Sequence, residues 1–282
     1  MDYQIIYVEQ GSDEWHKLRK TKITATDASV IMGVSKWKTP LQLWKYKTSD
    51  TPPEEPSEAA KRGIRLEPIV RDLYSQKTGY SYQPIVVSNQ WQMASLDGYS
   101  PDNREIIEIK CPNKDDHNLA KKGLIPDHYW PQVQHQMLIM GLEMLTYLSY
   151  DEKTLEIVHV KKDQEFCRVM WEKELEFLYF VREKIPPKRT YKDITERKDS
   201  DFMFAVAFWE RANNDLKFAK ELEEQARAEL IEACKEESCE GFGVKCSQVE
   251  RQGNVDYASI PELKNVDLEK YRKPATMYWK IS

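Results

Sequence analysis

Two short apolar segments joined by a turn constrain the fold of this chain more than any other feature. Residues 90–96 and 105–110 have the composition of β-strands, and residues 99–104 between them are rich in turn formers. We therefore predict a β-hairpin. Because side chains alternate along a strand, Glu108 and Lys110 share one face, and the turn brings Asp97 beside them.

Two carboxylates and an amine in one place suit the metal-assisted hydrolysis of a phosphodiester. Asp97, Glu108 and a main-chain carbonyl are oxygen ligands of the kind that Mg²⁺ takes. A bound metal polarises phosphate and lowers the pKa of water. Lys110 would orient or deprotonate that water, or stabilise charge on the phosphate. The competing interpretation is an exposed hairpin with an ordinary surface Glu–Lys pair, and the triplet taken alone favours it.

Composition places the chain among globular proteins. Its 282 residues, 40% apolar and 32% charged, suit one large domain, or one domain with an appendage. No run approaches about 18 apolar residues, so we expect no membrane-spanning helix. The N-terminus lacks a signal sequence and five cysteines are widely spaced, which favours a cytoplasmic protein with reduced thiols.

The net charge of −5 does not exclude a nucleic-acid partner. Residues 196–240 hold 13 acidic and 7 basic side chains, so the rest of the chain is close to neutral. A near-neutral body can still carry a basic cleft.

A second set of candidate residues lies upstream, where Arg19 precedes Thr24-Ala25-Thr26-Asp27. Thr24 and Asp27 fit a capping box at the start of a helix. Helix amides, hydroxyls and a guanidinium together would bind a phosphate. In the alternative interpretation, Thr24 and Thr26 only cap the helix and Arg19 is a solvated surface charge. Local sequence favours that alternative.

Two further polar residues lie on predicted helices. Glu67 lies on a helix that begins after Ser57 and ends at Gly79, and Pro68 is expected to kink it there. Gln132 lies on a helix predicted over residues 127–141. Either side chain could reach the hairpin, whereas local sequence favours a solvated Glu67 and a surface Gln132.

The C-terminal part of the sequence has a different character. Residues 199–233 carry apolar and small residues at alternating spacings of three and four, which predicts a long amphipathic helix. Short strands are expected at residues 241–250 and 278–281. This appendage is either a brace that packs on the core or a neighbouring subunit, which we favour, or a docking site for a partner or for displaced single-stranded DNA.

Taken together, these motifs resemble the lambda-exonuclease/YqaJ-type viral recombinase nucleases of the PD-(D/E)XK superfamily. The resemblance covers about residues 12–151 and rests on Trp15–Arg19 with Ile23–Thr26, Gly63–Glu67, Ser95–Gly98, Glu108–Pro112 and Tyr129–Gln134. Thr26 stands where the family often has serine, and Pro68 directly follows the motif glutamate.

The resemblance implies a role for each matching residue. It implies that Arg19 and Thr26 contact substrate phosphate and that Glu67 lies near the metal. It implies that the metal ligands are Asp97, Glu108 and the Ile109 carbonyl. It also implies that Lys110 is the catalytic lysine and that Gln132 is an active-site residue.

The fold implied is an α/β (α+β) PD-(D/E)XK core with a central mixed sheet flanked by helices. The core is expected at residues 1–195, and a helical and small α+β appendage at 196–282. The activity implied is a phage or prophage 5′-to-3′ exonuclease on double-stranded DNA ends. It would use Mg²⁺, most simply two ions with Mn²⁺ as a substitute, and would release 5′-mononucleotides and leave 3′ single strands. A ring-like homo-oligomer and a single-strand annealing partner are further implications.

Two other functions fit the same residues. A structure-specific or restriction-like endonuclease would use the same Asp97, Glu108 and Lys110, because these residues do not encode dependence on a DNA end. A DNA-binding or assembly protein that had lost activity would keep the fold, although the intact triplet argues against it.

Overall fold

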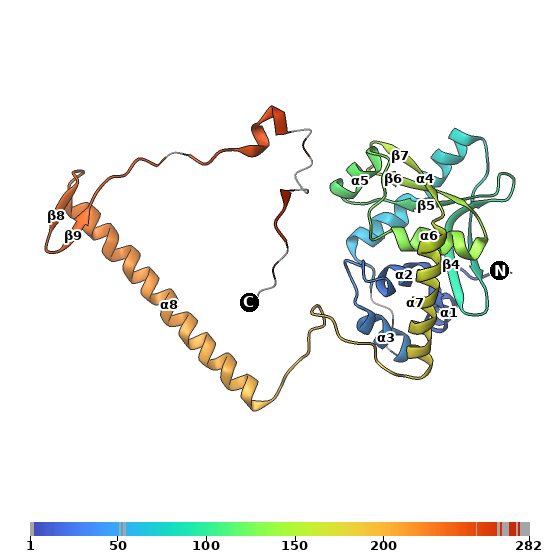
Figure 1. Cartoon of the computed structure of the whole chain (residues 1–282), viewed down its shortest axis with the longest axis horizontal. Helices are drawn as coiled ribbons and strands as arrows, with labels where there is room; N and C mark the ends of the chain where they lie inside the picture. The colour runs from blue at the N-terminus through green and yellow to red at the C-terminus, as the bar shows by residue number, and fades with distance from the viewer. Residues whose placement is uncertain are drawn as a thin grey trace. The chain divides into compact units, whose positions relative to one another are not determined.

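The computed structural model describes residues 3–50, 52, 55–251, 253–263, 266, 271–274 and 276. It divides into two units, residues 1–195 and 196–282, which are considered separately below (Figure 1). The strand predicted at 278–281 lies outside the described residues.

A mixed seven-stranded sheet forms the centre of the first unit. Six strands follow the order β1-β3-β4-β5-β6-β7, and β2 pairs with β4 in parallel. Strands β5 and β6 are also parallel, whereas the other neighbours are antiparallel. The bounds are β1 Gln4–Ile6, β2 Ile23–Thr24, β3 Gln83–Ser88, β4 Gln92–Ser100, β5 Glu105–Lys110, β6 Met144–Tyr150 and β7 Leu155–Lys161.

The predicted hairpin is β4 and β5, but its first strand is longer than the sequence indicated. Strand β4 runs through Ser100 because Gly98, Tyr99 and Ser100 pair with Ile107, Ile106 and Glu105. A Cβ on Gly98 would lie 2.7 Å from the Ile107 side chain, so this position requires glycine. The turn is therefore confined to residues 101–104.

Most helices of the first unit begin directly after a residue whose side chain caps them. Ser12, Thr24, Thr39 and Ser57 each accept a hydrogen bond from a backbone N–H of the first turn. The predicted capping box of Thr24 and Asp27 is present. The bounds are α1 Asp13–Thr21, α2 Ala25–Ile31, α3 Pro40–Thr48, α4 Glu58–Thr78, α5 Lys114–Lys121, α6 Trp130–Met140 and α7 Gln164–Arg182.

One helix prediction needs correction. Helix α6 begins at Trp130 rather than Asp127, because residues 127–129 form a turn and Pro131 lies in the first helical turn, where it loses no hydrogen bond. The bounds predicted for helix α4 are confirmed, since it runs from Glu58 to Thr78 with Ser57 and Gly79 as its caps and with Pro68 inside it.

The two faces of the sheet are covered by different helices, as Figure 1 shows for α4 and α6. On one face, Val70 and Tyr74 of α4 pack with Ile107 and Ile109. On the other face, α6 packs on apolar side chains of β3 to β7. Full burial of one such side chain stabilises the fold by about 1.5–3 kcal/mol. A smaller cluster joins β2, α2, α3 and α7 through Ile23, Val30, Leu43, Phe177 and Leu178.

The second unit contains one long helix and a small hairpin. Helix α8, Ser200–Ala233, is capped by Asp199, and none of its residues is buried. The strand predicted at 241–250 is instead two antiparallel strands, β8 Cys239–Gly241 and β9 Val244–Cys246. They are joined by Phe242 and Gly243, both at positive φ. Among the described residues, no helix combines the length and apolar character that crossing a membrane requires.

Candidate active site

The predicted hairpin brings Asp97, Glu108 and Lys110 together. The Ile109 N–H donates to Asp97 Oδ2 at 2.8 Å, and Lys110 Nζ donates to Glu108 Oε1. Glu108 is only 1% exposed. The alternative of an ordinary Glu–Lys pair on an exposed hairpin is therefore wrong.

Two glutamines of α6 hold the Glu108 carboxylate. Gln132 Nε2 donates to Oε1, and Gln136 Nε2 donates to Oε2 at 2.6 Å. Both amides are buried, so the surface interpretation of Gln132 is wrong. Gln136 was not predicted from the sequence. Its spacing of four residues from Gln132 places both on one helix face and could have indicated it.

Glu67 also faces the hairpin, from the side of α4. Its carboxylate forms an ion pair with Arg71, whose Nε donates to the Asp97 carbonyl at 2.5 Å. The Glu67 side chain is 27% exposed, so it is not simply solvated. Sequence analysis missed Arg71, although a pair spaced i, i+4 on one helix is a recognisable signal.

The charges of this site perturb one another. Burial, followed by the negative charge of Glu108, raises the pKa of Asp97 well above its ordinary value. Burial opposes the charge on Lys110, but Glu108 and Asp97 outweigh it and raise the Lys110 pKa. Burial is likewise the main cause of the raised pKa of Glu67. The site thus gathers three acidic groups around a cationic lysine.

The oxygen donors of the site fit a Mg²⁺ ion. Among the described residues, no three His, Cys, Asp or Glu side chains form a metal-ligand group. Mg²⁺ does not need one, because one or two carboxylates commonly hold it while water and substrate phosphate complete its shell. A divalent cation beside Asp97 and Glu108 would offset both the burial and the negative charge of Glu108, which together raise the Asp97 pKa. At Ile109, the structure shows the hydrogen bond from the backbone N–H to Asp97. The binding of a metal by the Ile109 carbonyl stays a prediction.

The two residues of the predicted phosphate anchor lie in contact, and their role in binding phosphate stays a prediction. One guanidinium nitrogen of Arg19 donates to Thr26 Oγ1 at 2.8 Å, and Arg19 lies 4.3 Å from the centre of the Trp15 ring. Thr24 caps α2 through its hydroxyl, which also lies within hydrogen-bond distance, 3.1 Å, of the exposed Thr26 Oγ1. Trp15 Nε1 donates to Ser95 at 2.9 Å, two residues before Asp97.

A buried ion pair holds the two segments that carry Arg19 and Thr26. Lys47 Nζ lies 2.7 Å from Asp27 Oδ2 and donates to the carbonyls of Arg19 and Lys22 at 2.7 Å. Burial would raise the Asp27 pKa, but the charges of Lys47 and Arg19 hold it below its ordinary value. The end of α1 is thereby fixed against the start of α2.

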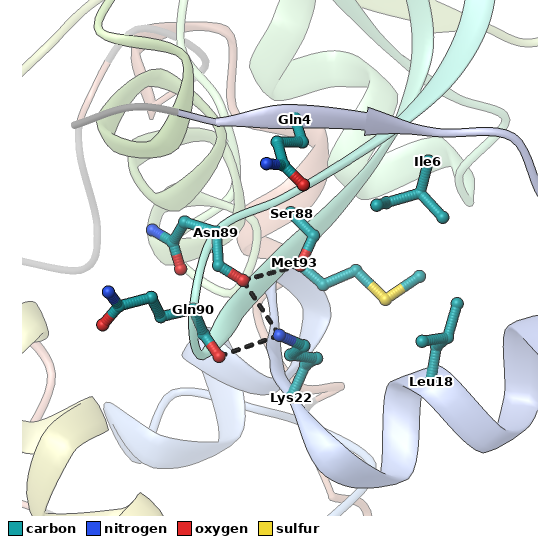
Figure 2. Close-up of a pocket in the computed structure, with 8 residues that line it drawn as sticks. All are labelled: Gln4, Ile6, Leu18, Lys22, Ser88, Asn89, Gln90 and Met93. Carbon is teal, nitrogen blue, oxygen red and sulfur yellow. Dashed lines mark hydrogen bonds between the residues drawn. The ribbon is translucent and has the colours of Figure 1, made fainter.

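A cavity of about 430 Å³ lies beside β1 and α1 (Figure 2). Lys22 Nζ donates to the carbonyls of Asn89 and Gln90 at 2.9 and 2.8 Å, as the dashed lines in Figure 2 mark. The wall holds none of the predicted site residues, so this cavity is separate from the carboxylate site. Its other lining residues are Gln4, Ile6, Leu18, Ser88 and Met93.

Comparison with known proteins shows a similarity to one family. Residues 14–143 match the YqaJ-like viral recombinase domain. This part of the chain is therefore similar to that domain. It is 30% identical over 178 residues to the uncharacterized protein YqaJ of Bacillus subtilis, a match that covers 60% of this chain. The same match covers 56% of YqaJ, so the chain spans about half the length of this relative.

The YqaJ-like domain also resembles solved structures. An alkaline exonuclease from Laribacter hongkongensis, LHK-Exo, is 26% identical with a TM-score of 0.53. Its complex with dAMP is 26% identical with a TM-score of 0.54. Each match covers 62% of this chain and 94% of the other. The predicted fold class, a mixed sheet flanked by helices in a lambda-exonuclease-like arrangement, is confirmed.

Proposed function

We propose that this protein is a metal-dependent exonuclease that degrades double-stranded DNA from an end with 5′-to-3′ polarity. The observation that carries the proposal is the meeting of Asp97, Glu108, Lys110 and Gln132 at one hairpin. The likeness of the YqaJ-like domain to an alkaline exonuclease supports the same reaction class.

Asp97 and Glu108 would hold Mg²⁺, with Glu67 as a further acidic group and the Ile109 carbonyl as a main-chain ligand. When bound, Mg²⁺ would supply polarisation of the scissile phosphate and a lowered pKa for the attacking water. Gln132 and Gln136 support this arrangement because their amides fix both oxygens of the Glu108 carboxylate. Arg71 adds to this arrangement, because it forms an ion pair with Glu67 and donates a hydrogen bond to the Asp97 carbonyl.

Lys110 would stabilise negative charge on the phosphate in the transition state. Although burial opposes its charge, the neighbouring carboxylates raise its pKa, so the amine is a cation at neutral pH. A cation is a donor rather than a base, which supports charge stabilisation over deprotonation of water. The Tyr129 ring lies 5.3 Å from Nζ and would restrict the directions open to the amine.

Arg19 and Thr26 would bind the phosphate at the 5′ end of the strand. Their mutual hydrogen bond and the contact of Arg19 with Trp15 hold the guanidinium before substrate arrives. Preorganisation of this kind reduces the entropy that binding must overcome. A phosphate at this position would give the enzyme a preference for phosphorylated ends.

The wider assignments follow from the family. We include in the proposal a ring-like homo-oligomer, a single-strand annealing protein as partner, and a phage or prophage origin with action in the bacterial cytoplasm. The match to a viral recombinase domain supports this setting. The product would be a 3′ single strand suited to annealing.

The first test compares a linear 5′-phosphorylated duplex with a covalently closed circle, each with Mg²⁺ and with a chelator. We expect the wild type to release 5′-mononucleotides from the linear DNA alone, only with Mg²⁺, and Lys110→Ala to release none. Cutting of the circle would instead favour an endonuclease. If neither DNA is hydrolysed, the assignment as a nuclease is wrong.

The second test addresses the phosphate anchor. Charged hydrogen bonds of this kind are worth about 1.5–3 kcal/mol, or about 10- to 100-fold in affinity, so Arg19→Ala should lose about that much preference for 5′-phosphate over 5′-hydroxyl ends. Competition between the two labelled duplexes measures it. Lys17→Ala, which removes an exposed cation from the same helix, serves as the control. A wild type that cleaves both ends equally contradicts the anchor.

A further inference from the structure

The loop between α2 and α3 presents a tryptophan to solvent. Trp37 is 65% exposed, although a tryptophan ring is one of the largest apolar groups that a fold can bury. The exposed ring lies between two lysines, Lys36 and Lys38. An exposed aromatic group between cations is typical of surfaces that bind single-stranded nucleic acid.

The loop is held in place by its own hydrogen bonds. Ser35 is buried, and its Oγ accepts from the N–H groups of Trp37 and Lys38, both at 3.2 Å. The Ser35 N–H donates to the Ser29 carbonyl of α2 at 3.0 Å. Thr39 then caps α3 directly after the loop. The ring is therefore preorganised, which reduces the entropy lost when a ligand stacks on it.

Rings connect Trp37 to the catalytic lysine. The Trp37 ring lies 5.2 Å from His128, edge to face, and 6.2 Å from Tyr129 at 30°. Tyr129 in turn lies 5.3 Å from Lys110 Nζ. A single ring thus separates Trp37 from the group assigned to the scissile phosphate.

Basic groups continue from Trp37 toward the phosphate anchor. Lys38 Nζ lies 5.4 Å from the centre of the Tyr46 ring, and Lys20 Nζ lies 5.3 Å from the same ring. Lys20 directly follows Arg19. On the other side of the tryptophan, Lys36 Nζ lies 3.3 Å from Asp116, which holds that end of the loop. Cations therefore flank Trp37 along the chain, and Lys36 shares its charge with Asp116.

We propose that Trp37 is a nucleobase-stacking subsite, which binds an unpaired base within the first three nucleotides of the strand that enters the active site. The flanking Lys36 and Lys38 would attract the phosphates beside that base. Stacking tolerates any base because every base has a flat π-face, as a nuclease that degrades all sequences requires. The location of the subsite rests on the proposed function, whereas base binding itself does not.

The test measures binding without cleavage. A fluorescent duplex with three unpaired nucleotides at a 5′-phosphorylated end is titrated in a chelator with wild type, Trp37→Ala and Trp37→Phe. Three further duplexes each carry one abasic nucleotide at the first, second or third position. Tyr191→Ala is the control, because Tyr191 is another exposed aromatic of the same unit. Circular dichroism and light scattering verify folding and oligomeric state.

We expect Trp37→Ala to weaken binding about 5- to 100-fold, as removal of one stacking ring does elsewhere. Trp37→Phe and Tyr191→Ala should stay within about 3-fold of wild type, because a phenyl ring still stacks. At one of the three positions, an abasic nucleotide should weaken DNA binding by the wild type and leave binding by Trp37→Ala unchanged. That position identifies the base that stacks.

Several outcomes would overturn the subsite. The first is that wild type and Trp37→Ala bind the DNA equally well. The second is that Trp37→Ala loses the same affinity for intact and for abasic DNA. The third is that the substitution changes only the oligomeric state. Failure of the proposed function is distinguishable. A wild type that binds through Trp37 but hydrolyses no DNA with Mg²⁺ retains the subsite and loses the nuclease assignment.

Discussion

Strand β5 carries two glutamates whose surroundings are opposite in kind. Among the described residues, the donors to Glu105 are all neutral groups, namely the hydroxyls of Tyr74, Tyr82 and Thr146 and the amide of Asn103. Glu108 lies three residues along, on the other face, and contacts Lys110 and two glutamine amides. Its neighbour Asp97 is a second carboxylate.

The pKa values separate the two sites. Burial would raise the Glu105 pKa, but the hydrogen bonds from Thr146, Tyr82, Asn103 and Tyr74 outweigh it and hold the pKa below its ordinary value. Beside Glu108, burial and like charge raise the Asp97 pKa. A satisfied carboxylate stabilises the fold, whereas crowded carboxylates store repulsion that a cation can relieve. The chemistry of the neighbours, rather than burial alone, therefore distinguishes the structural site from the candidate catalytic one.

The largest expected effect is on cleavage. Glu108→Gln should reduce the rate of mononucleotide release by at least about 10³-fold, because it removes the proposed metal ligand and a charge that positions Lys110. Glu105→Gln should change the rate by less than about 3-fold, since its side chain lies on the opposite face of β5. Steady-state assays on the linear duplex measure both.

Each variant serves as the control for the other, since both replace a glutamate by glutamine on one strand. Circular dichroism should first establish that both are folded. A Glu105→Gln enzyme as slow as Glu108→Gln would remove the distinction between the two sites.

Smaller effects are expected on the free energy of unfolding, and they have opposite signs for Asp97→Asn and Glu105→Gln. Without divalent cations, Asp97→Asn should stabilise the protein at neutral pH by about 0.5–2 kcal/mol, as relief of strain at functional sites commonly does. Glu105→Gln should destabilise it by about 1–3 kcal/mol, because an NH2 donor replaces one of the two carboxylate oxygens that accept hydrogen bonds. Urea unfolding measures both free energies.

The pH dependence of these free energies should also differ in sign. The folded pKa of Asp97 is raised above 3.8, so its contribution makes the fold less stable as pH rises through the interval above 3.8. The folded pKa of Glu105 is lowered below 4.5, so its contribution is present above 4.5 and is lost as pH falls. Asp97→Asn should remove the first slope and Glu105→Gln the second.

Matched surface substitutions define the baseline for these curves. Asp102→Asn, in the hairpin turn, and Glu14→Gln, on α1, replace exposed carboxylates. We expect each to change the free energy of unfolding by less than about 0.5 kcal/mol. A curve for Asp97→Asn that runs parallel to the wild type would contradict the raised pKa of Asp97.

Sequence patterns predicted local elements well where the signal lies within a few residues. The predicted helix starts at Thr24 and Ser57 are confirmed. The alternation in Glu105–Lys110 predicted strand β5 and its two faces. The spacing in residues 199–233 likewise predicted α8, but periodicity specifies a helix and not the surface that covers it, and none of its residues is buried.

Local sequence misjudged those polar residues whose partners come from other elements. Gln132 looked like a surface residue because its acceptor, Glu108, lies 24 positions away on a different element. Gln136 and Arg71 carried no motif, although they hold Glu108 and the Asp97 carbonyl. Strand β4 also extended past its predicted end, because pairing with β5 outweighed the turn-forming tendency of Tyr99 and Ser100.

The sequence by itself determined the hairpin, the caps and the placement of Glu108 and Lys110 on one face of a strand, because those features depend on neighbouring residues. Only the tertiary structure decided which carboxylate is satisfied and which is crowded. That difference arises from the packing of α4 against one face of β5 and α6 against the other. Burial, charge and hydrogen bonding at a side chain are properties of the whole packed sheet, and no short stretch of sequence contains them.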